Sequence, residues 1–86
     1  MQPTKAQKKI SDYNKLVGKL LNKYRNKRDL TIEELAKRSE VSVEQIVNIE
    51  SGDAVPSYVT MSLLARGLST HKNKVKVNQI YPDIEL

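Results

Sequence analysis

Two short segments in the middle of the chain repeat one hydrogen-bonding pattern. Thr31 is followed by Glu34, and Ser42 is followed by Gln45, each pair three positions apart. In this pattern the hydroxyl accepts the backbone N–H of the third helical residue, and the carboxylate or amide oxygen accepts the N–H of the hydroxyl residue. Each segment is therefore predicted to start a helix.

No pattern suited to catalysis or metal binding is present in the sequence. The single His71 lies in a polar stretch without a nucleophile or paired carboxylates, and the chain has no cysteine. Its three glycines are scattered and form no phosphate-binding loop. We therefore expect a protein that is not an enzyme, with no catalytic residue, no metal site and no cofactor.

The net charge of +5 is unevenly distributed along the chain. Residues 1–30 hold nine Lys or Arg against two Asp, residues 31–70 hold three basic residues against six acidic ones, and residues 71–86 hold three against two. A basic protein suits a polyanionic partner when its charge gathers on one surface. The first third is therefore expected to form a basic arm or face.

Length and composition indicate one small domain. The 86 residues, 38% of them apolar, can fill one modest core, and without cysteine that core must be held by packing alone. A reducing, cytoplasmic setting fits this composition. No apolar run approaches the roughly 18 residues of a membrane span, and the first residues lack the apolar core of a signal peptide. No membrane segment is expected.

The first helix is predicted from Ile10 to Tyr24, where apolar residues recur at helical spacing along one stripe. Lysines gather on the opposite side. This lysine face is either simply solvated or a contact for nucleic acid. Its members are Lys8, Lys15, Lys19 and Lys23.

Four further helices complete the predicted fold. Two follow the capping patterns, at Ile32–Ser39 and from Val43 to about Glu50, and Gly52 closes the second of them. Ser57 can cap a fourth helix. The segment Val75–Tyr81 fits either a strand or a short helix, and we prefer the helix. The fold class is therefore all-α, a compact domain of five helices with a short last one.

Two capped short helices joined by the Glu40-Val41 turn have the dimensions of a helix-turn-helix. The run TIEELAKRSEVSVEQIVNIESG, within about Val17 to Leu68, resembles the Cro and phage-repressor (Xre-like) helix-turn-helix family. The resemblance implies a compact repressor-type domain in which the helix Val43–Glu50 enters the major groove of double-stranded DNA. It also implies an ion pair between Arg25 and Glu50.

The resemblance assigns base recognition to Val43, Glu44 and Asn48. Val43 can contact a thymine methyl, a carboxylate can accept from cytosine N4, and an Asn can bind adenine N6 and N7. Glu44 has an alternative role, because an acid in the first turn of a helix complements the helix dipole. Contacts to the DNA backbone are expected from Ser42, Gln45, Lys37, Arg38, Lys27 and Arg28.

The sequence departs from the family at several positions that matter for phosphate binding or turns. Ile32 stands where the family has a phosphate-binding Gln, and the loop Asp53-Ala54-Val55 lacks the usual basic residues. Asp29 and Glu40 replace glycines, and a left-handed backbone at Glu40 would cost on the order of 1 kcal/mol. We therefore expect few phosphate contacts per protomer and a shallow dependence of affinity on salt.

Three parts of the chain are distinguished. Residues 1–9 are expected to form a basic flexible arm, residues 10–70 the helix-turn-helix domain, and residues 71–86 a linker with a short C-terminal helix or tail. The last part is a possible homodimer surface, since Val77, Ile80 and Tyr81 exceed what so short a tail needs for its own packing.

Two functions remain open at this point. The first is a sequence-specific transcriptional regulator, of the repressor type, that binds DNA as a symmetric dimer. The alternative is a protein-interaction module or antitoxin-like accessory protein on the same fold, with weak or no DNA binding. The acidic middle of the chain is natural for the second, and the fold alone does not choose between them.

Overall fold

The structure is a computed structural model that describes residues 2–84, and this part of the chain forms five helices and no strand. The all-α fold is the one predicted. Among the described residues, no helix combines the length and the apolar character needed to cross a bilayer. The helices are α1 (Lys5–Lys27), α2 (Ile32–Ser39), α3 (Val43–Ser51), α4 (Tyr58–Leu68) and α5 (Val77–Ile80).

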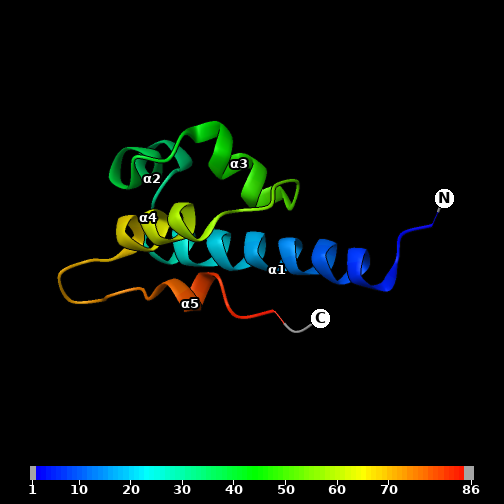
Figure 1. The fold of residues 1–86 in the computed structure, drawn as a ribbon. Coiled ribbons are helices and arrows are strands. Elements are labelled where there is room, and N and C mark those ends of the chain that lie inside the picture. Colours follow the sequence, from blue (N-terminus) through cyan, green and yellow to red (C-terminus); the bar gives the residue numbers. More distant parts are fainter. Residues whose placement is uncertain (1, 85–86) are drawn as a thin grey trace.

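α1 begins at Lys5, five residues before the predicted start at Ile10. Thr4 Oγ1 accepts the Gln7 N–H at 3.1 Å, and Gln7 Oε1 accepts the Thr4 N–H at 2.7 Å. This reciprocal cap starts the helix, so residues 5–9 form helical turns where a flexible arm was expected. Figure 1 shows the first turns of α1 projecting beyond the other helices.

Two pairs of helices are brought into close contact by glycines. A Cβ atom at Gly18 of α1 would lie 2.7 Å from the carbonyl oxygen of Glu50 and closer still to that of Ile49. A Cβ atom at Gly67 of α4 would lie 2.9 Å from the Cβ of Ser39. Only a residue without a side chain permits such an approach. α1 therefore packs directly against α3, and α4 against α2.

One apolar core joins these helix pairs to α5. Its members come from all five helices and from the connections after α2 and α4. Burying a Leu, Ile or Val side chain stabilises a fold by roughly 2 kcal/mol, so packing can hold this chain without a disulfide. The buried apolar residues are Val17, Leu21, Leu35, Val41, Ile46, Ile49, Met61, Leu64, Ala65, Leu68, Val75 and Ile80.

The turns before α2 and α3 place non-glycine residues in the left-handed region. Asp29 has a φ of 53° and Glu40 a φ of 63°. The resemblance implies glycine at both positions, and the left-handed backbone costs each of these residues about 1 kcal/mol relative to glycine. α3 is instead capped by Gly52, whose φ of 82° carries no such cost.

The C-terminal segment packs on its own domain. Residues 77–80 form a helix, as preferred, and Ile80 is fully buried. The rings of Tyr81 and Tyr13 pack edge to face, with their centroids 5.8 Å apart. The Tyr81 hydroxyl donates a hydrogen bond to the Pro56 carbonyl at 2.9 Å. These side chains are used within the domain, so the reason for placing a dimer surface here does not hold. The end of the predicted surface, residues 85–86, lies outside the described residues.

Candidate nucleic-acid interface

α3 has one side in the core and the other in solvent. Ile46 and Ile49 are buried, whereas Val43, Glu44 and Asn48 are exposed. The three residues that the resemblance assigned to base recognition therefore lie on the outward side of one helix, in the arc that helical spacing gives them. Figure 1 places α3 at the edge of the domain, next to α2. A helix presented in this way fits a groove about 12 Å wide.

Val47 belongs to the same outward surface and was missed by the sequence analysis. Its exposed fraction is 44%, compared with 40% for Val43 one turn earlier. Val47 lies outside the buried stripe formed by Ile46 and Ile49, and this mismatch is the signal that could have identified it. The two exposed valines offer methyl groups of the kind that contact thymine.

The outward side of α3 is fixed in place by an ion pair on its inner side. Arg25 Nε donates to Glu50 Oε2 at 2.7 Å and Arg25 Nη2 donates to Oε1 at 3.0 Å, so the guanidinium holds the carboxylate through two bonds. Asn22 Nδ2 also donates to Oε1 at 2.8 Å. The side chains of Arg25 and Glu50 are only 13% and 10% exposed. Glu50 is therefore directed toward α1 and away from solvent.

The same guanidinium also reaches the turn that precedes α2. Arg25 Nη1 donates to the carbonyl of Leu30 at 2.8 Å. Hydrogen bonding to Glu50 raises the pKa of Arg25, against the opposing effect of burial. This arginine thus remains charged at any physiological pH and ties α1, the turn and α3 together.

Ser42 and Gln45 form the predicted capping box at the start of α3. The Ser42 hydroxyl accepts the Gln45 N–H at 3.1 Å and donates to Gln45 Oε1 at 3.2 Å. Capping therefore uses both hydrogen-bonding directions of the hydroxyl. The Gln45 amide nitrogen takes part in no hydrogen bond within residues 2–84, and the side chain is exposed. Of the two residues, Gln45 is the one with a donor left for a phosphate.

Two arginines that were expected at the DNA backbone are instead bound to the end of α4. Arg28 Nε donates to the carbonyl of Leu68 at 2.9 Å. Arg38 Nε donates to the carbonyl of Gly67 at 2.7 Å, and its Nη2 donates to that of Ser69 at 2.9 Å. Cations stabilise the C-terminal end of a helix, where carbonyls lack partners. The structure therefore uses these two guanidiniums to hold the fold.

The two lysines of the predicted backbone set are exposed. Lys37 lies on the outer side of α2, and Lys27 lies at the end of α1 with its Nζ 5.4 Å from the centre of the Tyr24 ring. Neither lysine is in an ion pair within the described residues. Both remain available to a phosphate.

A hollow of about 250 Å³ separates α3 from the loop before α4. Gln45 and Asn48 line one side of it, and Val55 and Pro56 line the other. The carboxylate of Asp53, at the start of the loop, accepts the Ser51 hydroxyl at 3.0 Å. The loop thus presents acidic and apolar groups near Asn48 and no basic side chain.

The fold and the outward face of α3 define a helix-turn-helix protein. A family model described as helix-turn-helix, of the Cro and repressor type, matches residues 21–73, and the chain belongs to this family. The family is one of DNA-binding regulator domains and not of enzymes. Comparison with curated proteins and with solved structures found no match.

Proposed function

We propose that this protein is a cytoplasmic, sequence-specific transcriptional repressor that inserts α3 into the major groove of DNA. The observation that carries the proposal is the outward face of α3, formed by Val43, Glu44, Val47 and Asn48, on a helix fixed to α1 through Arg25 and Glu50. A rigid helix with exposed hydrogen-bonding and apolar side chains is what direct reading of base edges requires.

The side chains of this face can contact different bases. Asn48 can bind adenine through N6 and N7, Glu44 can accept from cytosine N4, and Val43 and Val47 can contact thymine methyl groups. Glu44 also lies in the first turn of α3, where its charge complements the helix dipole. The proposed site is therefore richer in A·T contacts than in contacts to guanine, for which arginine would be needed.

Positive charge for the phosphates comes from α1 rather than from the loop after α3. The Cα of Lys15 lies 3.3 Å from the position that a Cβ on Gly52 would occupy, so the lysine face runs past the end of α3. Lys15 and Lys19 are exposed. Together with Lys27, Lys37 and the Gln45 amide, they supply the backbone contacts of the proposed complex.

A symmetric dimer would place two copies of α3 on a pseudo-palindromic site, with half-sites about one turn, or ~34 Å, apart. Within residues 2–84, the most exposed apolar side chains are Val55, Tyr58 and Val59, at 77%, 63% and 68%. Tyr58 shares a hollow with Ile84, which extends this surface toward the C-terminal segment. We place the dimer contact around Tyr58 and Ile84, because exposed apolar groups that lie together mark association sites.

Selection of bound sequences from random duplex DNA tests the proposal. Recovery of a two-fold motif is the expected result, and absence of any enrichment at low salt would contradict it. Asn48→Ala should then weaken binding to the selected site by about 1–3 kcal/mol and leave binding to random DNA nearly unchanged. Ser51→Ala on the same helix is the matched control. Equal losses on both DNAs would remove Asn48 from base reading.

A protein-interaction role is the second candidate, and one observation favours it. The acidic residues of α2 border an open apolar groove next to the start of α3. Such a surface suits a protein segment better than a phosphate.

A further inference from the structure

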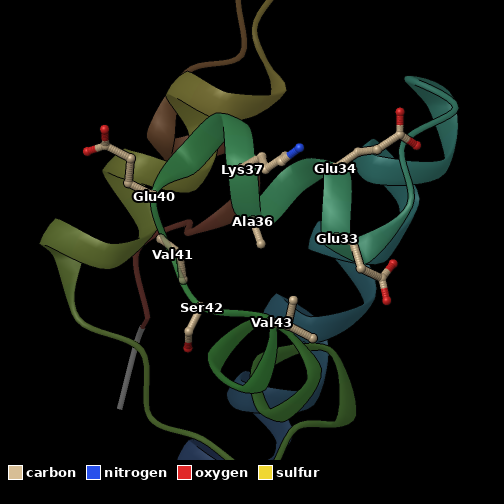
Figure 2. A pocket seen from close by; sticks show the side chains of 8 residues that line it. All are labelled: Glu33, Glu34, Ala36, Lys37, Glu40, Val41, Ser42 and Val43. Carbon is tan, nitrogen blue, oxygen red and sulfur yellow. The ribbon is translucent and has the colours of Figure 1, made fainter.

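A groove of about 650 Å³ lies between α2 and the start of α3. Figure 2 shows Ala36, Val41 and Val43 converging on it, with Glu33 at one side and Glu40 at the other. The groove is open to solvent and lies between two helices. It therefore suits an elongated occupant, such as one side of a helix, rather than an enclosed small molecule.

Carboxylates outnumber cations around the groove. Glu33, Glu34 and Glu40 border it with Lys37 as the one basic residue of its lining. Hydrogen bonding from the Thr31 backbone lowers the pKa of Glu34, so this residue keeps its negative charge. Glu33 is exposed and takes part in no hydrogen bond or ion pair within the described residues.

We propose that the groove between α2 and α3 is a docking site for a basic amphipathic helix of a partner protein. The apolar floor accepts leucine-like side chains at the spacing of three and four residues, and the carboxylates pair with lysines or arginines on both flanks of that helix. A phosphate backbone would meet the same carboxylates with repulsion. Charge complementarity thus selects a cationic protein segment as the occupant.

Docking at this site excludes DNA, a consequence that rests on the proposed function. Val43 belongs both to the floor of the groove and to the outward face of α3. A helix seated on Val43 would occupy the space that the major groove needs. The partner therefore acts as an antagonist of DNA binding, and the docking step itself requires no DNA.

A designed peptide tests the docking step. The probe is a helix of about 14 residues, or four turns, with leucines spaced three and four apart and lysines on both sides. A twin peptide carries glutamate in place of each lysine. Titrated into the isotope-labelled full chain, the lysine peptide should shift the NMR amide signals of Ala36, Val41 and Val43 to saturation, and the twin should not. Equal effects of the two peptides, or shifts confined to other helices, would overturn the proposal.

Matched charge reversals locate the contact. Glu33→Lys should weaken the lysine peptide about tenfold, the change expected when a rim attraction becomes a repulsion. Asp12→Lys, the same charge change on the projecting end of α1, should leave the affinity unaltered. No loss with Glu33→Lys would refute the assignment.

Displacement of the selected DNA duplex tests the exclusion. The lysine peptide should release DNA from the wild-type chain and should be about tenfold less effective on Glu33→Lys. Peptide and DNA bound at the same time would contradict the antagonism. A chain that binds the peptide but no DNA would reject the regulator and retain the docking site, whereas a chain that binds DNA but not the peptide would do the reverse.

Discussion

α1 and the helix-turn-helix formed by α2 and α3 use their charges in opposite ways. The lysines of α1 are exposed and are in no ion pair within residues 2–84. In the helix-turn-helix, Glu50 is bound by Arg25 and Glu34 closes the cap at Thr31. The lysines of the first region are thus free for a partner, while two carboxylates of the second are committed to the fold.

This difference changes the meaning of the acidic middle of the chain. The negative net charge of residues 31–70 suggests that this segment repels DNA. Glu50, however, is nearly buried and does not contribute to the outward face of α3. The carboxylates of α2 and α3 that a partner can meet are those of Glu33, Glu34, Glu40 and Glu44, which are all exposed. Net charge counted along a sequence therefore overstates the acidity of the surface that faces a ligand.

Replacing Glu50 should have the largest effect on stability. Glu50→Ala leaves the Arg25 guanidinium largely buried without its partner, and we expect the free energy of unfolding to fall by about 3 kcal/mol. Thermal or denaturant unfolding measures it. Glu44→Ala removes the same side chain from the exposed side of α3 and should change stability by less than about 0.5 kcal/mol. Equal losses would abolish the distinction between committed and free carboxylates.

Removing lysines from α1 should affect DNA binding and not stability. Lys15→Ala with Lys19→Ala should reduce the slope of log affinity against log salt by about 2, one unit for each lost phosphate contact. Lys72→Ala with Lys74→Ala makes the same charge change in the exposed connection between α4 and α5. If both double variants shift the slope alike, the lysines act through total charge and not through a surface on α1.

The backbone of Glu40, in the turn between α2 and α3, is strained. Glu40→Gly should raise the free energy of unfolding by about 1 kcal/mol, because glycine adopts the left-handed backbone freely. The contact between Glu40 and Arg66, 3.9 Å and well exposed, contributes little to set against this gain. Glu33→Gly lies within α2 and should lower stability by a similar amount. A gain from both substitutions would show that charge, not backbone geometry, is the cause.

Local signals explain which elements could be predicted from the sequence. The starts of α2 and α3 agree with their capping boxes, because each box is complete within four residues. The same signal, Thr4 with Gln7, was overlooked at α1. The family resemblance supplied the Arg25–Glu50 pair, which spans 25 positions and has no local signature.

The partners of side chains that reach across the fold could not be predicted from the sequence. Arg28 binds a carbonyl 40 positions away, and nothing in its neighbours distinguishes it from the exposed Lys27. The packing of the short tail could not be predicted for the same reason, since the partner of Tyr81 on α1 is set by the packing of whole helices. Gly18 could have been recognised, because a glycine within a helix is unfavourable unless another backbone approaches it.

Replacing Glu34 should have the smallest effect on stability, and this effect should be visible only at acid pH. Its pKa is lowered by hydrogen bonds from Thr31, chiefly from the backbone N–H, so the folded state binds its proton less readily than the unfolded chain does. The stabilisation is therefore complete above the ordinary value of 4.5 and is lost as the pH falls through the lowered pKa.

Glu34→Gln keeps an oxygen that can accept the Thr31 N–H, as Gln7 and Gln45 accept the corresponding N–H in the caps of α1 and α3. The variant should lose less stability than the wild type when denaturant unfolding is compared between neutral and acid pH. Identical pH profiles would mean that the carboxylate charge contributes nothing to the cap. Glu34 would then belong, with Glu33, to the charges of α2 that do not stabilise the fold.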